Sequence, residues 1–190
     1  MVRPIATTRT AAGLPTGRLA VWWVIASEIV IFGGLLAGYV MHRLGHPEWA
    51  DYAQHTNVWF GGTNTVVLLT SSLTAVLAHQ AAEQGDGKKA AKLLGVTMFG
   101  AILFVCIKAV EWTTEISHGY TITANTFWSF YYVAAGLHAL HVIAGAVIMG
   151  IVAMDAMKNK ELQRVELIGI YWHFVDIVWI FLFPLLYIAH

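Results

Sequence analysis

The stretch "WWVIASEIVIFGG", residues 22–34, decides the fold class of this chain. It lies inside an apolar run of more than twenty residues, and a helix needs about 20 such residues to cross the hydrocarbon of a bilayer. One carboxylate, Glu28, interrupts the run. A charged side chain at mid-bilayer costs ~2.5–3.5 kcal/mol on insertion scales, so the presence of Glu28 requires a structural or functional reason.

The composition of the whole chain is also that of a membrane protein. Of its 190 residues, 58% are hydrophobic and 12% are charged, and the mean hydropathy is +0.65, whereas a soluble domain carries about 25% charged residues. The formal net charge is zero, so no basic surface points to nucleic acid as a partner. The single cysteine, Cys106, has no partner for an internal disulfide or a CxxC metal site.

Five segments are long and apolar enough to span a membrane, and the connections between them are short. The predicted spans are 19–41, 63–82, 91–113, 126–153 and 166–188. The sequence therefore predicts an all-α membrane protein, a bundle of five transmembrane helices over residues 19–190 that follows a tail at residues 1–18. The first apolar run exceeds the roughly 7–15-residue core of a cleavable signal, so we expect it to be retained.

The distribution of Lys and Arg predicts the orientation. Nine of these residues lie in the tail and in the second and fourth connections, whereas Arg43 alone lies in the other connections. The nine are Arg3, Arg9, Arg18, Lys88, Lys89, Lys92, Lys158, Lys160 and Arg164. Because positively charged loops stay in the cytoplasm, we expect a cytoplasmic N-terminus and a C-terminus outside.

Small residues mark the expected packing surfaces of the helices. Gly34 and Gly38 have the GxxxG spacing. The fourth span adds Ala134, Ala135, Gly136, Ala139, Ala144, Gly145 and Ala146. Because small residues let helix backbones approach closely, we expect a tightly packed bundle or a subunit interface at these positions.

Five titratable side chains from three spans fall at similar depths. At about 1.5 Å per residue, Glu28 lies ~13 Å into the first span and Asp176 a comparable ~12 Å into the fifth, with His173 one turn lower. His138 and His141 lie just beyond the middle of the fourth span, which runs in the opposite direction. The sequence therefore predicts a buried polar cluster of these five residues, in which Glu28 is protonated or hydrogen-bonded.

Three interpretations of this polar cluster stay open. The groups can satisfy one another as hydrogen bonds between helices, they can take part in proton handling, or they can hold a metal ion. The metal reading rests on two His at i, i+3 together with carboxylates, a set that suits a hard or borderline ion. The residue types by themselves do not choose among the three.

Other polar and aromatic residues lie nearer the ends of the spans. Lys108 and Glu111 are one turn apart at the outer end of the third span, and we expect them to pair or to extend toward water. Trp112, Trp128 and Tyr187 are interpreted as interfacial anchors.

Motifs on all five spans resemble subunit III of the haem–copper oxidases. They are "SEIVIFGG" (27–34), "NTVVLLTSSLTAVLAHQA" (64–81), "IKAVEW" (107–112), "FWSFYYVAAGLHALHVIAG" (127–145) and "YWHFVDIVWIFLFPLLYI" (171–188), in the family's order. The resemblance implies an accessory subunit of a respiratory terminal oxidase that stabilises the catalytic subunit, holds lipids and supports proton uptake. It implies no catalytic residue, metal or redox cofactor in this chain. Haem and copper are expected in partner subunits, and subunits I and II are the expected partners.

Within that family, the acid that matches Glu28 is a buried carboxylate known for its reaction with hydrophobic carbodiimides. Larger members have seven helices, and this chain resembles the five-helix bacterial form, which implies a multi-pass protein of the bacterial cell membrane. The ending, with Pro184 inside the last span, and the "IKAVEW" motif also resemble subunit-III-like proteins associated with nitric oxide reduction.

Other classes of function fit the residues less well. A catalytic subunit with two haems and a copper needs about six buried histidines, whereas only His138, His141 and His173 lie well inside the spans. A membrane di-metal oxygenase would gather His at the cytoplasmic face, where the chain offers almost only His79, which we expect to be hydrated. A small proton or ion transporter using Glu28 stays open, although no internal repeat is visible.

Overall fold

The computed structural model of the chain describes residue 13 and residues 15–188. Five helices are long and apolar enough to cross a membrane, which confirms the predicted all-α membrane fold. They are α1 (Thr16–Gly45), α3 (Val58–Glu83), α4 (Gly87–Ser117), α5 (Thr126–Met157) and α6 (Gln163–Phe183), and α6 continues as a π-helical turn, η2 (Pro184–Ile188). Arg3 and Arg9, two of the charges that predict the orientation, lie outside the described residues.

Polar side chains fix where three of the helices begin. Asn57, Asp86 and Asn125 each accept a hydrogen bond of 3.0 Å from a backbone N–H in the first turn of α3, α4 and α5. Such caps satisfy N–H groups that have no partner within the helix. A short helix that the sequence did not predict, α2 (Trp49–Ala53), lies in the connection between α1 and α3.

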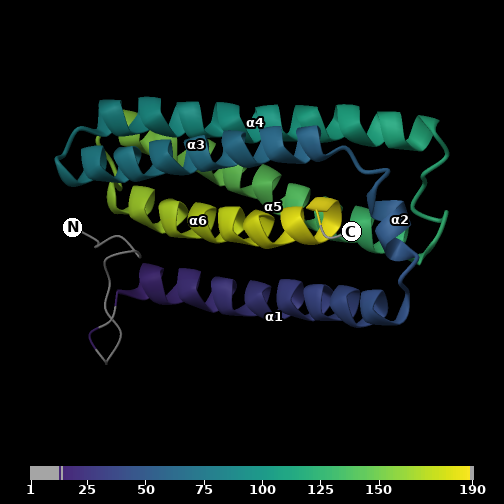
Figure 1. Cartoon of the computed structure of the whole chain (residues 1–190). Helices are drawn as coiled ribbons and strands as arrows, with labels where there is room; N and C mark the ends of the chain where they lie inside the picture. Colours follow the sequence, from purple (N-terminus) through teal and green to yellow (C-terminus); the bar gives the residue numbers. More distant parts are fainter. Residues whose placement is uncertain (1–12, 14, 189–190) are drawn as a thin grey trace.

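The long helices form a four-helix bundle with α1 laid along its side. Helix α3 packs against α4 and α6, and α5 packs against the same two helices, while α1 contacts α6 and α5 (Figure 1). The buried residues of α1 form a single stripe, Gly17, Ile25, Phe32 and Tyr39. The rest of its surface is left open, so α1 is the least enclosed of the five helices.

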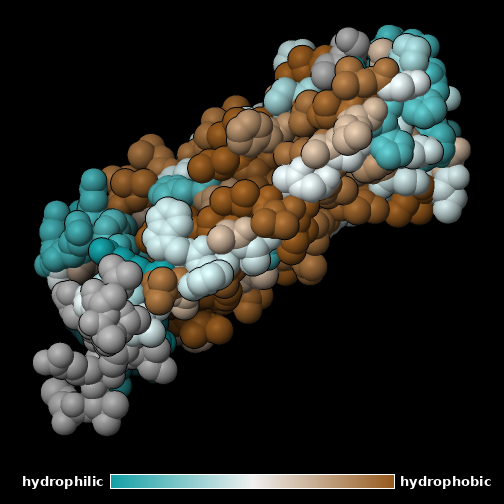
Figure 2. All heavy atoms as spheres, turned by 90° about the horizontal axis from the view of Figure 1, so that it is seen from below, coloured by the Kyte–Doolittle hydropathy of each residue, from teal (hydrophilic) through white to brown (hydrophobic). Residues whose placement is uncertain are grey.

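The outer surface of the bundle matches a membrane environment. Figure 2 shows the face that carries α1, with a hydrophobic middle and hydrophilic ends. Large apolar side chains such as Trp23, Val30 and Met41 are more than two thirds exposed on this helix. Apolar side chains in this position would face lipid or a partner subunit.

Small residues bring some of the helices together, but not all of those predicted to do so. A Cβ atom added to Gly145 would lie 3.1 Å from the Trp172 ring, so α5 and α6 are closely apposed there. A Cβ at Gly38 would meet Phe130 at 3.7 Å, whereas one at Gly34 would meet nothing within 4 Å among the described residues. The GxxxG pair therefore does not form a tight contact within this part of the chain.

The interpretation of the aromatic residues as interfacial anchors is wrong for two of the three. Trp128 and Tyr187 are both 0% exposed and belong to the core of the bundle. Trp112 is half-buried. Because these helices are apolar all round, the sequence shows that an aromatic residue lies near a helix end but not whether it faces lipid or the bundle.

Candidate functional site

The five residues of the predicted polar cluster do not form one cluster. Glu28 and His141 meet across α1 and α5, at a distance of 2.9 Å. His173 contacts α3, whereas His138 is enclosed by aromatic rings. Neither oxygen of Asp176 has a hydrogen-bond partner in the described part of the chain.

The contact between Glu28 and His141 joins the loosely held α1 to the bundle. Oε2 of Glu28 lies 2.9 Å from Nε2 of His141, and each side chain is 15% exposed. The distance is that of an ion pair, although the ring N–H does not point along the line to the oxygen as in a well-aligned hydrogen bond. The Phe32 ring covers His141 edge-on, with 5.2 Å between the ring centroids.

The second nitrogen of His141 limits the protonation states of this pair. Nδ1 lies 2.7 Å from the carbonyl oxygen of Leu137, and a carbonyl only accepts, so Nδ1 carries a proton. Nε2 and Oε2 are 2.9 Å apart, within the range of an ion pair, so a proton carried by either residue would be attracted to the other. A pair that holds one such proton is either a carboxylate with an imidazolium or a carboxylic acid with a neutral imidazole. Both states have zero net charge and differ only in the position of that proton.

His173 and Asp176 lie on the side of α6 that packs on α3. The Ser72 hydroxyl lies 2.7 Å from Nδ1 of His173, and it is also the side chain that interacts with Asp176. Asp176 is 4% exposed. The Ser72 hydroxyl thus bonds to His173, while the Asp176 carboxyl group is buried without a hydrogen bond among the described residues.

His138 sits in the centre of the bundle between two aromatic rings. Its ring stacks on Trp179 with 5.2 Å between centroids and meets Phe104 edge-on at 5.4 Å. Neither ring nitrogen has a hydrogen-bond partner within the described residues. In that part of the chain, no group of three or more His, Cys, Asp or Glu side chains is placed to hold a metal ion.

Lys108 and Glu111 belong to a buried network that the sequence only partly indicates. Nζ of Lys108 lies 3.0 Å from Oε2 of Glu111, and both residues are 1% exposed, so they pair without extending toward water. Tyr131 of α5 and Tyr187 of η2 close around them with hydrogen bonds of 2.6–3.1 Å. The Lys108 ammonium also lies 5.0–5.7 Å from the centroids of four aromatic rings.

A second acid of this network, Glu115, was missed by the sequence reasoning. It lies within α4, but the predicted third span ended at residue 113 and placed it in a loop. Tyr131 donates to Oε1 of Glu115 or of Glu111, at 3.0 and 2.8 Å. The spacing Lys108, Glu111, Glu115 is i, i+3, i+7, which puts the three on one helix face and could have revealed the network.

The π-helical turn η2 ties this network to α1 and to the α1–α3 connection. Carbonyl groups at a helix end have no partner within the helix. Here the Leu185 carbonyl accepts hydrogen bonds from Tyr39 at 2.8 Å and from Arg43 at 3.5 Å, both on α1. Thr56 reaches the Leu186 carbonyl at 3.5 Å. The short turn therefore connects most of the elements at this end of the bundle.

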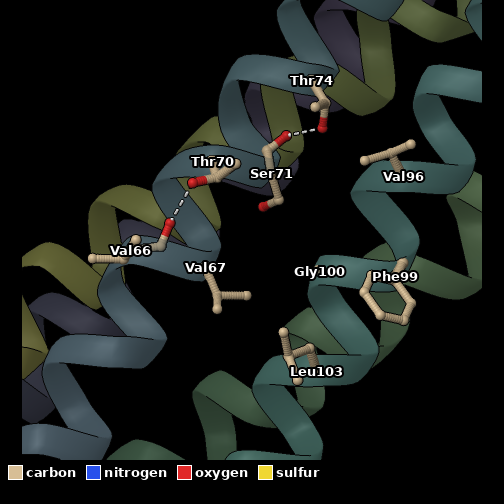
Figure 3. A pocket seen from close by; sticks show the side chains of 9 residues that line it. All are labelled: Val66, Val67, Thr70, Ser71, Thr74, Val96, Phe99, Gly100 and Leu103. Atoms are coloured by element: carbon tan, nitrogen blue, oxygen red, sulfur yellow. Dashed lines mark hydrogen bonds between the residues drawn. The ribbon is translucent and has the colours of Figure 1, made fainter.

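Surface crevices between the helices are lined mainly by apolar side chains. A groove of about 230 Å³ between α3 and α4 is shown in Figure 3, and its hydroxyls bond back to their own helix, Thr70 to the Val66 carbonyl and Thr74 to the Ser71 carbonyl. A larger apolar crevice of about 620 Å³ lies between α1 and the α5–α6 pair, with Arg164 at its edge. His79 lies near the end of α3, where its side chain is partly exposed and its Nε2 lies 3.5 Å from Oε1 of Glu83.

These features describe a class of protein: a multi-pass membrane bundle with paired buried charges and no metal cluster among the described residues. Comparison with known sequences gives the family. The sequence profile of the family described as Cytochrome c oxidase subunit III matches residues 7–190. The chain therefore belongs to the cytochrome c oxidase subunit III family.

Individual relatives agree with this assignment. The chain is similar to cytochrome c oxidase subunit 3 of Corynebacterium diphtheriae, with 33% identity over 170 residues that cover 86% of this chain and 83% of the relative. It is 34% identical to a probable cytochrome c oxidase subunit 3 of Mycobacterium tuberculosis over 172 residues, 88% of this chain and 84% of the relative. A haem–copper oxidase subunit I+III of Aeropyrum pernix is 32% identical over 184 residues, which are 90% of this chain and 22% of that longer protein.

Membership in this family defines the chain's general role. It is an accessory subunit of the oxidase complex in the respiratory chain and is not catalytic by itself. The metal centres of the complex lie outside this family of subunits, and the chain associates with other oxidase subunits. Its five membrane-spanning helices and bacterial relatives agree with a multi-pass membrane protein.

Proposed function

We propose that the chain supports proton uptake by the catalytic subunit of its oxidase through the Glu28–His141 pair. The observation that carries this proposal is the close approach of Oε2 of Glu28 to Nε2 of His141, 2.9 Å apart. Because His141 already donates from Nδ1 to Leu137, a proton held by the pair could move between Nε2 and Oε2 without changing the net charge of the pair. A pair with zero net charge avoids the cost of an isolated buried charge.

The exposure of the pair supports an exchange with its surroundings. Both side chains are 15% exposed, in contrast to His138, which is 0% exposed. They lie where α1 rests on the bundle, next to the open surface of α1. A partner subunit or water on this side can therefore reach the proton, and stabilisation of the partner through α1 is part of the same proposal.

The proposed orientation follows the positive charges. Lys88, Lys89 and Lys92 begin α4 at the end of the bundle where Lys158 and Arg164 flank the α5–α6 turn. We assign this end to the cytoplasm and the end with α2 and η2 to the outside, because basic loops remain cytoplasmic. The membrane is then the bacterial cell membrane, with residues 1–18 as a cytoplasmic tail on a bundle over residues 19–190.

Subunit I is the proposed direct partner. In the Aeropyrum pernix relative, one chain carries both subunits I and III by name, which supports a contact between the two in separate chains. Haem and copper are assigned to the partner subunits, and subunit II is a further proposed partner. The electron donor is left open by this proposal.

The crevice beside α1 is the proposed place for a bound phospholipid. Its lining is apolar, with Ala20 and Val24 of α1 facing Ile148 and Val152 of α5, and Arg164 stands at the polar edge. An acyl chain would fill the crevice, and the Arg164 guanidinium, which also pairs with Asp155 at 3.0 Å, would contact the phosphate. Native mass spectrometry should show loss of phospholipid in Ala20→Phe, while Leu73→Phe, on the exposed surface of α3, should keep it.

The experiment that tests proton uptake compares Glu28→Gln and His141→Gln in the assembled oxidase. Both variants should keep the haem content of the complex, while turnover slows or the active lifetime of the enzyme shortens. Glu83→Gln, whose parent side chain is 67% exposed, is the matched control and should behave like the unmodified complex. Loss of haem in Glu28→Gln would contradict the proposal and indicate a purely structural role.

A further inference from the structure

The buried Lys108 network contains two carboxyl groups, Glu111 and Glu115, but a single ammonium group. Three ionisable side chains of α4, Lys108, Glu111 and Glu115, are 1%, 1% and 5% exposed. If all three were ionised, two carboxylates would share one ammonium. A buried charge without a counter-ion is strongly unfavourable, so one of the acids must be neutral or must be compensated.

The hydrogen bonds of Lys108 and Glu111 identify that pair as the ionised one. The ammonium of Lys108 has three protons, and it donates to Oε2 of Glu111 at 3.0 Å, to Tyr131 at 3.1 Å and to Tyr187 at 2.6 Å. Tyr187 in turn donates to Oε1 of Glu111 at 2.6 Å. Both oxygens of Glu111 thus accept hydrogen bonds, one of them from a cation.

Glu115 lacks these partners. In the described part of the chain, the Tyr131 hydroxyl is its one close donor, and its proton is shared with Glu111, since the two distances are 3.0 and 2.8 Å. Tyr132 lies 3.4 Å from Oε2 of Glu115, but it donates at 2.7 Å to the Tyr120 carbonyl, which can only accept. Among the residues that the structure describes, a charged Glu115 would therefore have one shared hydrogen bond and no ion-pair contact.

We propose that Glu115 holds an exchangeable proton and that the Lys108–Glu111–Glu115 network is a proton-binding site at the α2 end of the bundle. A protonated Glu115 makes the network neutral and can donate from Oε2 to the Tyr132 hydroxyl. Protons reach it from the aqueous phase at the α4–α5 connection, which follows the end of α4 at Ser117, two residues after Glu115. The site goes beyond the proposed function, because it lies on other residues than the Glu28–His141 pair.

The groups that face this proton come from three elements. Lys108 and Glu111 share helix α4 with Glu115, and Tyr131 and Tyr132 approach from α5. Tyr187 completes the network from η2. A positive charge at the same end of the bundle is Arg43 of α1, which bonds to the Leu185 carbonyl of η2.

Infrared spectroscopy of the purified oxidase complex tests the proposal directly. The carbonyl band of a protonated carboxylic acid is separate from the bands of carboxylates, and it shifts when the acid proton is replaced by deuterium. The difference spectrum between the unmodified complex and Glu115→Gln should show loss of one such band. The lost band should be one that shifts promptly in D₂O. Glu83→Gln should leave these bands unchanged.

A second variant measures the role of Lys108. In Lys108→Met, Glu111 loses its counter-ion and should take up a proton, so the spectrum should gain a protonated-carboxyl band. A spectrum without this gain would overturn the assignment of Glu111 as the ionised partner of Lys108. Retention of every protonated-carboxyl band in Glu115→Gln would show that Glu115 is ionised and would overturn the proposal.

Thermal unfolding gives an independent measurement on the matched pair Glu115→Gln and Glu111→Gln. Glutamine has the shape of a protonated glutamic acid, so Glu115→Gln should assemble and unfold at the temperature of the unmodified complex. Glu111→Gln removes an ionised partner and should unfold at a lower temperature. Failure of Glu115→Gln to assemble, or an equal loss of stability in the two variants, would contradict a protonated Glu115. The results for Glu28→Gln bear on the proposed function alone, so the two proposals can fail separately.

Discussion

The side chain of Asn159 accepts a hydrogen bond of 3.0 Å from the backbone N–H of Gly87. Asn159 lies in the α5–α6 turn and Gly87 is the first residue of α4, so this bond joins two connections at the same end of the bundle. A Cβ on Gly87 would overlap the Ala156 carbonyl and the Asn159 side chain. Glycine is therefore required here by the close approach of two backbones.

Gly87→Ala should destabilise the protein by about 1–3 kcal/mol, because a backbone carbonyl cannot move aside as a flexible side chain can. Thermal unfolding in detergent measures the effect. Gly95→Ala, in the same helix with nothing within 4 Å of the added Cβ among the described residues, is the control and should be neutral or stabilising. An equal loss of stability in both variants would show that alanine destabilises helix α4 in general, and that the contact at Gly87 is not the cause.

The backbone of Asn159 provides a second prediction, because its φ angle is +51°. Asn159→Gly loses the bond to Gly87, about 1 kcal/mol, and tolerates the positive φ angle. Asn159→Ala loses the same bond and adds strain of roughly 1–2 kcal/mol in the left-handed region. The unfolding temperature should fall in the order unmodified, Asn159→Gly, Asn159→Ala. A reversed order of the two variants would contradict this account of the turn.

Removal of the buried cation should be severe. Lys108→Met leaves Glu111 buried without its partner and should cost about 3–5 kcal/mol of stability. The double variant Lys108→Met with Glu111→Gln removes both charges and should recover part of that loss. Unfolding of the two variants in parallel measures the recovery, and a double variant that is less stable than the single one would show that the pair is not coupled.

Tyr39→Phe should loosen α1 at the α2 end. The substitution keeps the ring but removes the hydrogen bond to the Leu185 carbonyl, a loss of about 0.5–1.5 kcal/mol. Hydrogen exchange of the η2 amides should become faster. Tyr52→Phe, which keeps the contact of that ring with Phe127, is the control, and unchanged exchange in Tyr39→Phe would indicate that other contacts hold η2.

Much of the fold could be predicted because the membrane imposes it. A helix must satisfy all backbone groups inside lipid, so apolar length alone identifies the five spans. The helix ends required other information. Hydropathy marks the part of a helix in hydrocarbon, while α3 begins five residues before its predicted span, at a cap provided by Asn57.

The candidate site was harder to predict, because depth along a helix does not give the direction of a side chain. Glu28 and His141 do lie at compatible depths and meet. His138 lies on α5 at a depth similar to that of His141, yet its side chain faces the Trp179 ring in the core. In helices that are apolar all round, no polar face reveals the rotation, so one predicted cluster became separate groups in the structure.

The one-turn spacing of Lys108 and Glu111 has a consequence for how the protein is made. Helices of a membrane protein enter the bilayer in the order of synthesis. Tyr187, which forms hydrogen bonds with both Lys108 and Glu111, belongs to the last of them. At the moment when α4 is inserted, Lys108 and Glu111 can already neutralise each other within one helix. Helix α4 can therefore enter the bilayer with its two charges already paired, without a contact to any other span. The hydrogen bonds from the later helices then add to an ion pair that formed during insertion.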